Sequence, residues 1–341
     1  MKKIIKNKYI ILIPIIILNI ISLIYLKNTP YFKKQLIIYI ISLITLLITS
    51  KLNYKYIKKF IIPSYIVTTI LLIYVLLFGK NINGAKAWIH LNNIAIQPSE
   101  LAKISLILIL TLKYKNLLIP SILTTIPSIL TFLEPDTGST IIYLIIFISL
   151  LKYIKPNKKI TIFTSVIASL FLLFNITTYL TNKDILTNIY GSKILYRIDR
   201  LISFKNQDNI QNKYSQIAIG SHKLLYIPEN HNDFIFASII SKYPTPIFVL
   251  LLISFISIIT YYLYNISHKK NTSNIINYMI LNMLIFQIFY NILMNLSLVP
   301  IIGIPLPFLS YGGSYTISLY ILIGLSINLN IHSNSSKVDM A

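Results

Sequence analysis

The sequence predicts an all-α protein that crosses a membrane about ten times. Hydrophobic residues fill 55% of its 341 positions. They form runs long enough to cross a hydrocarbon core, which takes about 20 helical residues. Backbone amides in lipid must bond within their own segment, so such runs are helices. The absence of cysteine excludes disulfides and thiol catalysis, and the five scattered histidines lack the ligand spacing of a zinc site.

Ten apolar runs define the predicted helices, and they belong to one domain that spans residues 1–341. The runs lie near residues 9–26, 35–50, 60–79, 98–112, 117–133, 137–151, 160–180, 245–264, 274–299 and 311–330. The first run follows several lysines, as a signal peptide does, but no small-residue cleavage site comes after it. We therefore interpret it as a permanent helix.

The lysines fix the orientation, because loops rich in Lys and Arg stay in the cytoplasm. Inside loops would hold Lys2, Lys3, Lys6, Lys8, Lys51, Lys55, Lys58, Lys59, Lys113, Lys115, Lys152, Lys155, Lys158, Lys159, Lys269, Lys270 and Lys337. The short outside loops would hold only Lys27, Lys33, Lys34, Lys80 and Lys86. Both termini are therefore expected in the cytoplasm. The net charge of +22 does not gather into one patch, which argues against nucleic acid as a partner.

With this orientation, four informative segments fall on the extracytoplasmic side: residues 84–100, 134–138, 181–236 and 300–313. Most of the nine glycines lie in them, and glycine serves where the backbone needs a positive φ or a close approach. The third segment precedes the eighth predicted helix and exceeds the usual loop length of about 12–15 residues, which favours a functional loop.

Glu100 and Lys103 lie one helical turn apart near the start of a predicted membrane helix. A charge inside a membrane is costly unless it is paired or faces an aqueous cavity. Either the pair lines a cavity that opens to the outside, or it is a structural salt bridge.

Two other outer segments carry polar residues with two possible roles. Asp136 follows a helix-breaking proline, where it either caps the next helix or contacts substrate or a cation. Ser310 and Ser314 lie in a Gly- and Pro-rich break, which either binds an anion or simply connects two helices.

Asp233 closes the long polar loop and is followed directly by the apolar sequence of a membrane helix. Its carboxylate is the first candidate for acid-base chemistry outside the membrane, ahead of Glu229, His231 and His222. The alternative is that Asp233 caps the helix that follows.

In order and spacing, these segments resemble the SEDS family of shape, elongation, division and sporulation proteins, over about residues 80–330. The matching motifs are Gly84-Ala85-Lys86-Ala87-Trp88, Gln97-Pro98-Ser99-Glu100-Leu101-Ala102-Lys103, Glu134-Pro135-Asp136-Thr137-Gly138, Ile217-Ala218-Ile219-Gly220-Ser221, Pro228-Glu229 with His231, Asp233-Phe234-Ile235-Phe236-Ala237, and Gly303 to Ser314. The short tail and residues 303–308 look more like the elongation type, RodA, than the division type, FtsW.

The resemblance implies a glycosyltransferase of the bacterial cytoplasmic (inner) membrane. Such an enzyme polymerises lipid II into peptidoglycan strands on the outer face, with a class B penicillin-binding protein as its transpeptidase partner and membrane lipid around it. The essential Asp of the family's large outer loop falls on Asp233, and its buried Glu and Lys fall on Glu100 and Lys103. Two departures stand out: a glycine-rich stretch before Pro228 is shortened, and Ser241-Lys242 replaces a Glu pair.

The expected chemistry needs a base and a group that stabilises charge on the leaving pyrophosphate. Asp233 would take the proton of the acceptor hydroxyl. Arg197, Arg200 or a divalent cation (Mg or Mn) would hold the pyrophosphate, with His231 nearby as a substrate-binding residue.

Two alternatives remain open. A precursor flippase needs polar groups near mid-membrane with access from both sides, whereas only Asp339 among the nine acids is expected in the cytoplasm. A non-catalytic scaffold of the elongation machinery would depend on no single carboxylate.

Overall fold

The computed structural model describes residues 9–82, 85–91, 94–113, 116–154, 210–221, 227–243, 245–268 and 272–332. These residues form eleven helices and three short strands. The helices are α1 (Leu12–Leu26), α2 (Phe32–Lys51), α3 (Tyr54–Phe78), α4 (Pro98–Lys113), α5 (Leu118–Leu133), α6 (Thr137–Leu151), α10 (Ile210–Ser221), α11 (Ile235–Lys242), α12 (Thr245–His268), α13 (Thr272–Asn295) and α14 (Gly313–His332). The strands are β1 (Lys80–Ile82), β2 (Ala85–Leu91) and β3 (Ile94–Ile96).

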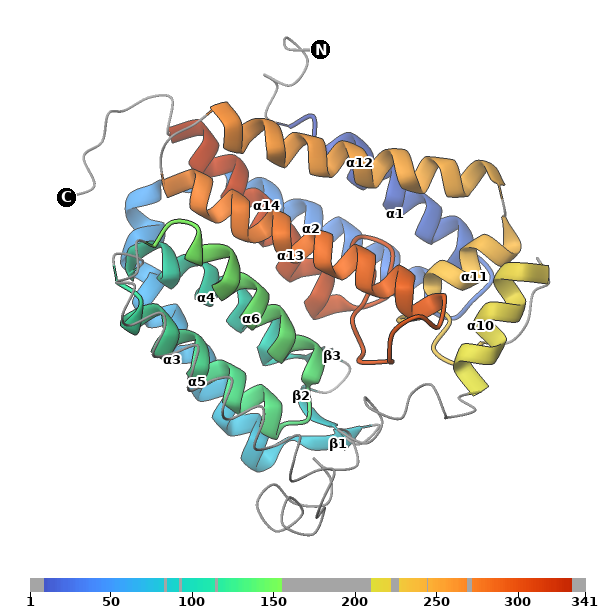
Figure 1. Cartoon of the computed structure of the whole chain (residues 1–341), viewed down its shortest axis with the longest axis horizontal. Helices are drawn as coiled ribbons and strands as arrows, with labels where there is room; N and C mark the ends of the chain where they lie inside the picture. Colours follow the sequence, from blue (N-terminus) through green and yellow to red (C-terminus); the bar gives the residue numbers. More distant parts are fainter. Residues whose placement is uncertain are drawn as a thin grey trace.

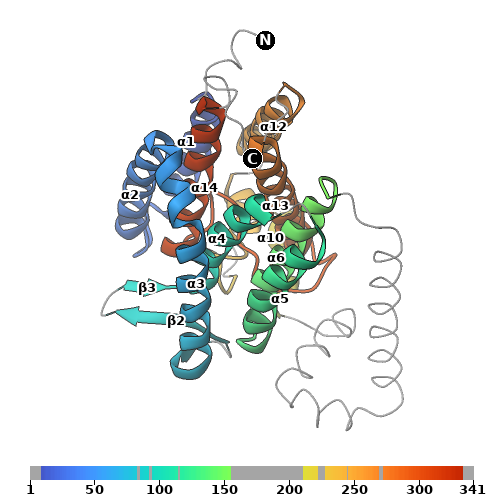
Figure 2. The ribbon, with the colours of Figure 1, turned by 90° about the vertical axis from the view of Figure 1, so that its left-hand side faces the viewer.

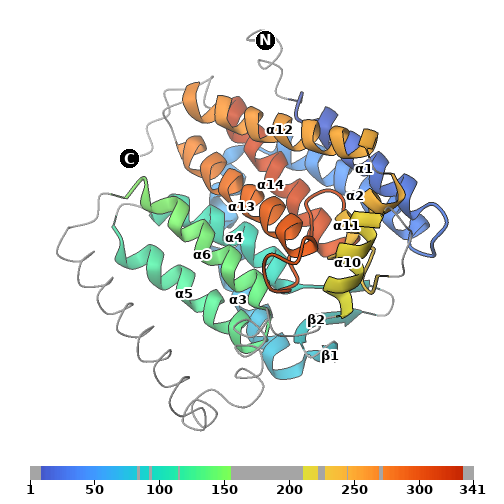
Figure 3. The ribbon, with the colours of Figure 1, turned by 45° about the vertical axis from the view of Figure 1, so that its right-hand side comes forward.

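The long helices form one bundle (Figures 1 and 3). Helices α1 and α12 lie along one edge, α3 and α5 lie along the opposite edge, and α13 and α14 lie between them. Helix α2 packs against α14. The centre of the bundle is apolar, with Leu319, Tyr320 and Ile323 of α14 fully buried. Outward-facing apolar side chains such as Ile66 and Ile70 of α3 are more than half exposed, as expected for a surface that contacts lipid.

Helix α14 packs against α2 at unusually short range, because Gly324 presents no side chain there. A Cβ at this position would lie 1.9 Å from the Thr49 Oγ1 and 2.7 Å from the Leu46 carbonyl oxygen. Close backbone approach of this kind is a common use of small residues between membrane helices.

Nine of the ten predicted membrane helices are present, and the predicted helix at 160–180 lies outside the described residues. Within the described residues, α2, α3, α12 and α13 are long and apolar enough to cross a membrane, and α1, α5, α6 and α14 are shorter apolar helices. The fold is therefore that of a multi-pass helical membrane protein.

Two features differ from the sequence prediction. The segment between α3 and α4 folds into a small antiparallel sheet in the order β1-β2-β3, seen projecting from the bundle in Figure 2. Asp233 also does not lead straight into a membrane helix, because the eight-residue α11 comes first. The break at Tyr243 has a local cause: the next residue is a proline, which disfavours helical backbone in the residue before it, and Tyr243 has φ −138° and ψ 75°.

Candidate functional site at the outer end of the bundle

The segments expected on the extracytoplasmic side meet at one end of the bundle. Ser314, at the start of α14, accepts a hydrogen bond from the backbone N–H of Gln97 (3.1 Å) and donates to the carbonyl of Ala95 (3.3 Å). The backbone N–H of Tyr311 donates to the carbonyl of His231 (2.8 Å). The predicted convergence is thus observed for the described parts of these segments. Ser314 joins the sheet to α14 through these bonds.

Residues 227–234, here called the Asp233 turn, form a compact structure before α11. Glu229 has φ 57°, a left-handed conformation uncommon for a side chain other than glycine. Its carbonyl accepts from the N–H groups of Asn232 (3.0 Å) and Phe234 (3.3 Å), and its carboxylate accepts from the Asn232 amide (2.7 Å). The turn is therefore held by its own hydrogen bonds.

The carboxyl group of Asp233 has an altered acidity. Burial, and secondarily the charge of Glu229, raises the pKa of Asp233 from 3.8 to about 6. A carboxylate with such a pKa is a stronger base than an ordinary Asp and is still mostly ionised at neutral pH. One of its oxygens faces Gly303, where a Cβ would lie 3.8 Å away. Gly303 itself has φ 68°, which confirms the expected use of glycine here.

The capping alternative for Asp233 is wrong. Phe234 is the residue that precedes α11, and no side chain caps the helix from that position. Asp233 lies one residue before this position, and its backbone carbonyl accepts hydrogen bonds from side chains of α13.

The ring of His231 lies in an aromatic cluster next to the turn. It stacks on Tyr31, between α1 and α2, with ring centroids 4.0 Å apart and an interplanar angle of 12°. The ring of Tyr311 meets it edge-on at 5.6 Å. Burial lowers the pKa of His231, against the opposing effect of the Glu229 charge, which favours the neutral ring. A direct contact between His231 and substrate stays a prediction.

Ser310 holds the Asp233 turn against the loop before α14. Its hydroxyl donates to the carbonyl of Asn232 (2.8 Å) and accepts from the N–H of Leu306 (2.8 Å). The nearby Phe308 has φ 66°, and such strain persists only where the surroundings fix it. Here Tyr39 of α2 donates to the Phe308 carbonyl (3.0 Å). The hydroxyl hydrogen of Ser310 is thus used in the bond to the Asn232 carbonyl. Anion binding by Ser310 or Ser314 stays a prediction.

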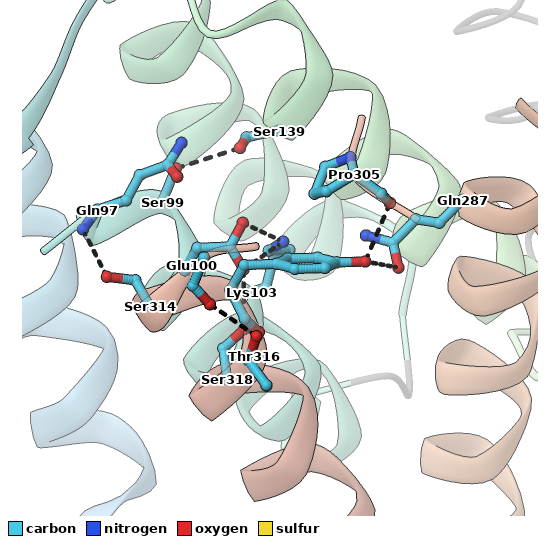
Figure 4. A network of polar contacts seen from close by, with 12 residues as sticks. Gln97, Ser99, Glu100, Lys103, Ser139, Gln287, Pro305, Ser314, Thr316 and Ser318 are labelled. Atoms are coloured by element: carbon cyan, nitrogen blue, oxygen red, sulfur yellow. Dashed lines mark hydrogen bonds and ion pairs between the residues drawn. The ribbon is translucent and has the colours of Figure 1, made fainter. Parts of the chain in front are cut away.

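Glu100 and Lys103 form an enclosed ion pair (Figure 4). The Lys103 Nζ lies 2.6 Å from the Glu100 carboxylate, and the Ser318 hydroxyl of α14 donates to the same carboxylate (2.8 Å). Lys103 also lies over the ring of Tyr315, 5.3 Å from its centroid. Their exposed fractions are only 4% for Glu100 and 1% for Lys103. This is the geometry of the structural salt bridge, one of the two alternatives that the sequence left open.

Asp136 caps α6, as one of its two predicted roles required. One carboxylate oxygen accepts from the N–H of Ser139 (3.0 Å), while the other accepts from the side chains of Gln97 (2.9 Å) and Ser99 (2.8 Å). Both oxygens therefore have partners within the protein, and these partners link α6 to the start of α4. A substrate or cation contact of Asp136 stays a prediction.

Glu134, in the same turn, was not singled out from the sequence. Its side chain is fully buried, and neither carboxyl oxygen has a hydrogen-bond partner among the described residues. Burial, together with the charge of Asp136, raises the pKa of Glu134 to about 9. This carboxyl is therefore protonated at neutral pH.

Two residues of α13, Asn291 and Asn295, were also missed. Both are fully buried and both contact the backbone of Asp233. Their spacing of four residues places them on one face of α13, and this spacing was the signal that the sequence offered. The predicted pyrophosphate ligands Arg197 and Arg200 lie outside the described residues.

The fold is that of a multi-pass membrane protein, with the Asp233 turn and its carboxyl group at the outer end of the bundle. The family of cell cycle proteins that comprises FtsW, RodA and SpoVE matches residues 5–335. The chain belongs to this family, also known as SEDS.

Individual relatives agree with this assignment. A probable peptidoglycan glycosyltransferase FtsW of Buchnera aphidicola (subsp. Baizongia pistaciae) is 31% identical over 305 residues, which cover 80% of this chain and 76% of the relative. The peptidoglycan glycosyltransferase MrdB of Escherichia coli K12 is 27% identical over 302 residues, with coverage of 79% and 77%.

Solved structures share the fold. A chain from a peptidoglycan synthase complex that coordinates polymerization and crosslinking superposes with a TM-score of 0.80 at 21% identity, covering 96% of this chain and 98% of that one. The rod shape determining protein RodA of Thermus thermophilus gives a TM-score of 0.68 at 21% identity, with coverage of 97% and 98%.

Proposed function

We propose that the chain is a peptidoglycan glycosyltransferase that polymerises lipid II on the outer face of the bacterial cytoplasmic membrane. The observation that carries the proposal is the Asp233 turn: a carboxylate with a pKa raised to about 6, placed at the outer end of the bundle. Membership in a family whose relatives carry the name peptidoglycan glycosyltransferase supports the choice of reaction.

In the proposed reaction, a hydroxyl of the acceptor sugar attacks the anomeric carbon of the donor. A new carbon–oxygen bond forms, the bond between the anomeric carbon and the lipid pyrophosphate breaks, and Asp233 takes the hydroxyl proton. Arg197 and Arg200 are the proposed partners of the leaving pyrophosphate, because the guanidinium group pairs with phosphate oxygens at two points.

A divalent cation (Mg or Mn) is the alternative to these arginines as the partner of the leaving pyrophosphate. The described residues contain no group of three or more His, Cys, Asp or Glu side chains suited to hold a metal ion.

The partner is proposed to be a class B penicillin-binding protein that cross-links the new strand. The superposition on a chain from a complex that coordinates polymerization and crosslinking supports this pairing. Relatives include proteins named FtsW and MrdB, and the RodA-like residues 303–308 support a role in elongation rather than division.

The test is to incubate the purified full-length chain and its partner with labelled lipid II and to separate the products by gel electrophoresis. A ladder of glycan strands is expected. If lipid II stays monomeric with the partner present, the polymerase proposal fails. Movement of intact lipid II across vesicle membranes would instead support the flippase alternative.

A further inference from the structure

Asn291 and Asn295 lie one turn apart near the end of α13 and converge on a single atom of the Asp233 turn. Their side-chain amide nitrogens donate to the backbone carbonyl oxygen of Asp233 at 2.9 Å and 3.0 Å. A carbonyl oxygen has two lone pairs, so both hydrogen bonds form together. The backbone of the proposed base is therefore held from one side by a pair of amides.

The same two side chains bind the segments on either side of the base. The Asn291 amide also donates to the carbonyl of Ile304 (2.8 Å). The Asn295 side-chain oxygen accepts from the backbone N–H of Ala237 (3.0 Å), in the first turn of α11. Helix α11 has no cap of its own from Phe234, so Asn295 satisfies one of its unpaired N–H groups from outside.

The hydrogen-bond partners also fix how each amide is oriented. The carbonyls of Asp233 and Ile304 only accept, which requires the nitrogen of the amides to face them, while the Ala237 N–H only donates. The Asn295 nitrogen also lies 2.8 Å from the Asn291 backbone carbonyl and 3.1 Å from the Asn291 side-chain oxygen. Its two N–H groups are therefore shared among three acceptors, and none is left without a partner. Buried amides with every partner in place form a rigid unit.

We propose that Asn291 and Asn295 are positioning residues for Asp233, which set the location of its carboxylate by fixing its backbone. This inference rests on the proposed polymerase function. Neither amide touches the carboxylate in the described contacts, so they act on where the base lies rather than on its acidity. A displacement of about 1 Å at a reacting group lowers a rate by up to about 10²-fold.

The test compares Asn295→Asp and Asn291→Leu with the control Asn282→Leu. Asn295→Asp keeps an oxygen for the Ala237 N–H and loses the donor to Asp233. Asn282 lies on the same helix but donates to Ser149 of α6 (2.9 Å), away from the Asp233 turn. The readouts are kcat and KM for labelled lipid II, the pH dependence of kcat/KM, and hydrogen exchange of peptides that cover residues 227–237.

Both test variants should lower kcat by about 10- to 100-fold with KM nearly unchanged. The acid limb of the pH profile should stay unmoved in Asn291→Leu, which adds no charge beside Asp233. Exchange in 227–237 should rise, whereas exchange in α4 stays as in the wild type. Asn282→Leu should keep kcat within about twofold, as a distant polar change does. The positioning proposal is overturned if the test variants keep wild-type kcat and exchange, or if Asn282→Leu loses as much kcat as they do. A wild-type protein that makes no glycan would overturn the polymerase proposal, and hydrogen exchange would still decide whether the amides hold the turn.

Discussion

The turns that contain Glu134 and Asp233 each bring an acid to the outer end of the bundle, but Glu134 is fully buried and Asp233 is only partly buried. Burial raises the pKa of both carboxyls, with a neighbouring acid adding to the effect in each case. The pKa of Glu134 reaches about 9, so this group keeps its proton at neutral pH. The pKa of Asp233 stops at about 6, so it is mostly ionised. A carboxyl group can act as a base only when its pKa stays below the pH at which the enzyme works, because the protonated group cannot accept another proton.

The largest expected effect is on the rate of glycan synthesis. It is tested by replacing each of the two acids with its amide. Asp233→Asn removes the base while keeping the shape, and should lower the rate of glycan synthesis by about 10²- to 10⁴-fold. Glu134→Gln replaces a neutral acid with a neutral amide and should leave the rate within a few-fold. Both are measured as glycan ladders from labelled lipid II with the partner present. Near-normal ladders from Asp233→Asn would remove this residue from the mechanism.

The carboxyl group of Glu100 extends the comparison with Glu134 and Asp233, because it is buried next to a cation, the side chain of Lys103. Glu100→Ala or Lys103→Ala leaves the other charge buried without its partner, at a cost of about 3–5 kcal/mol in stability. Thermal unfolding in detergent should show a large loss for each single variant, and the double variant should recover part of it. Single variants that melt like the wild type would show that the pair does not stabilise the fold.

Gly324→Ala tests whether a loss of stability alone changes activity in the same way as a substitution at the outer end of the bundle. The new Cβ would clash with Thr49 and the Leu46 carbonyl of α2, and such overpacking typically costs about 1–3 kcal/mol. Its melting temperature should fall while the pH dependence of its activity stays that of the wild type. Gly220→Ala is the matched control, since a Cβ there meets nothing within 4 Å. Equal melting of the two variants would contradict the close packing of α2 and α14.

A further comparison concerns the stability of Glu134→Gln as a function of pH. Because the folded-state pKa of Glu134 is raised from 4.5 to about 9, the folded protein holds a proton that the unfolded chain releases. The wild type therefore loses stability as pH rises through this range, by at most about 1.4 kcal/mol per pH unit. The melting temperature of Glu134→Gln relative to that of the wild type should therefore rise from pH 5 to pH 8. An advantage that is constant with pH would mean that Glu134 is ionised in the folded state.

Much of the fold was predictable from the sequence because long apolar runs leave the backbone few alternatives in lipid. Pro98 does begin α4, and Asp136 does cap α6. The sheet was missed because β1 and β3 have three residues each, too few for a readable alternation. The break between α11 and α12 was also missed, because both segments are apolar.

The candidate site was predictable only in part. Asp233 was identified from its place between a polar loop and an apolar run, and from the family resemblance. Its supports, Asn291 and Asn295, lie about 60 residues further along the chain, and only tertiary packing shows what they contact. The altered acidity of Glu134 likewise depends on burial, which a sequence without an alignment does not reveal.

The most direct test of the central claim is the pH dependence of kcat/KM for lipid II polymerisation by the wild type and by Glu134→Gln. If the Asp233 carboxylate is the base, the rate should be level above about pH 7 and should fall about tenfold per pH unit below its pKa of about 6. The same limb should appear in Glu134→Gln. A rate that stays unchanged down to pH 5, or a limb that disappears in Glu134→Gln, would contradict the assignment of Asp233 as the base.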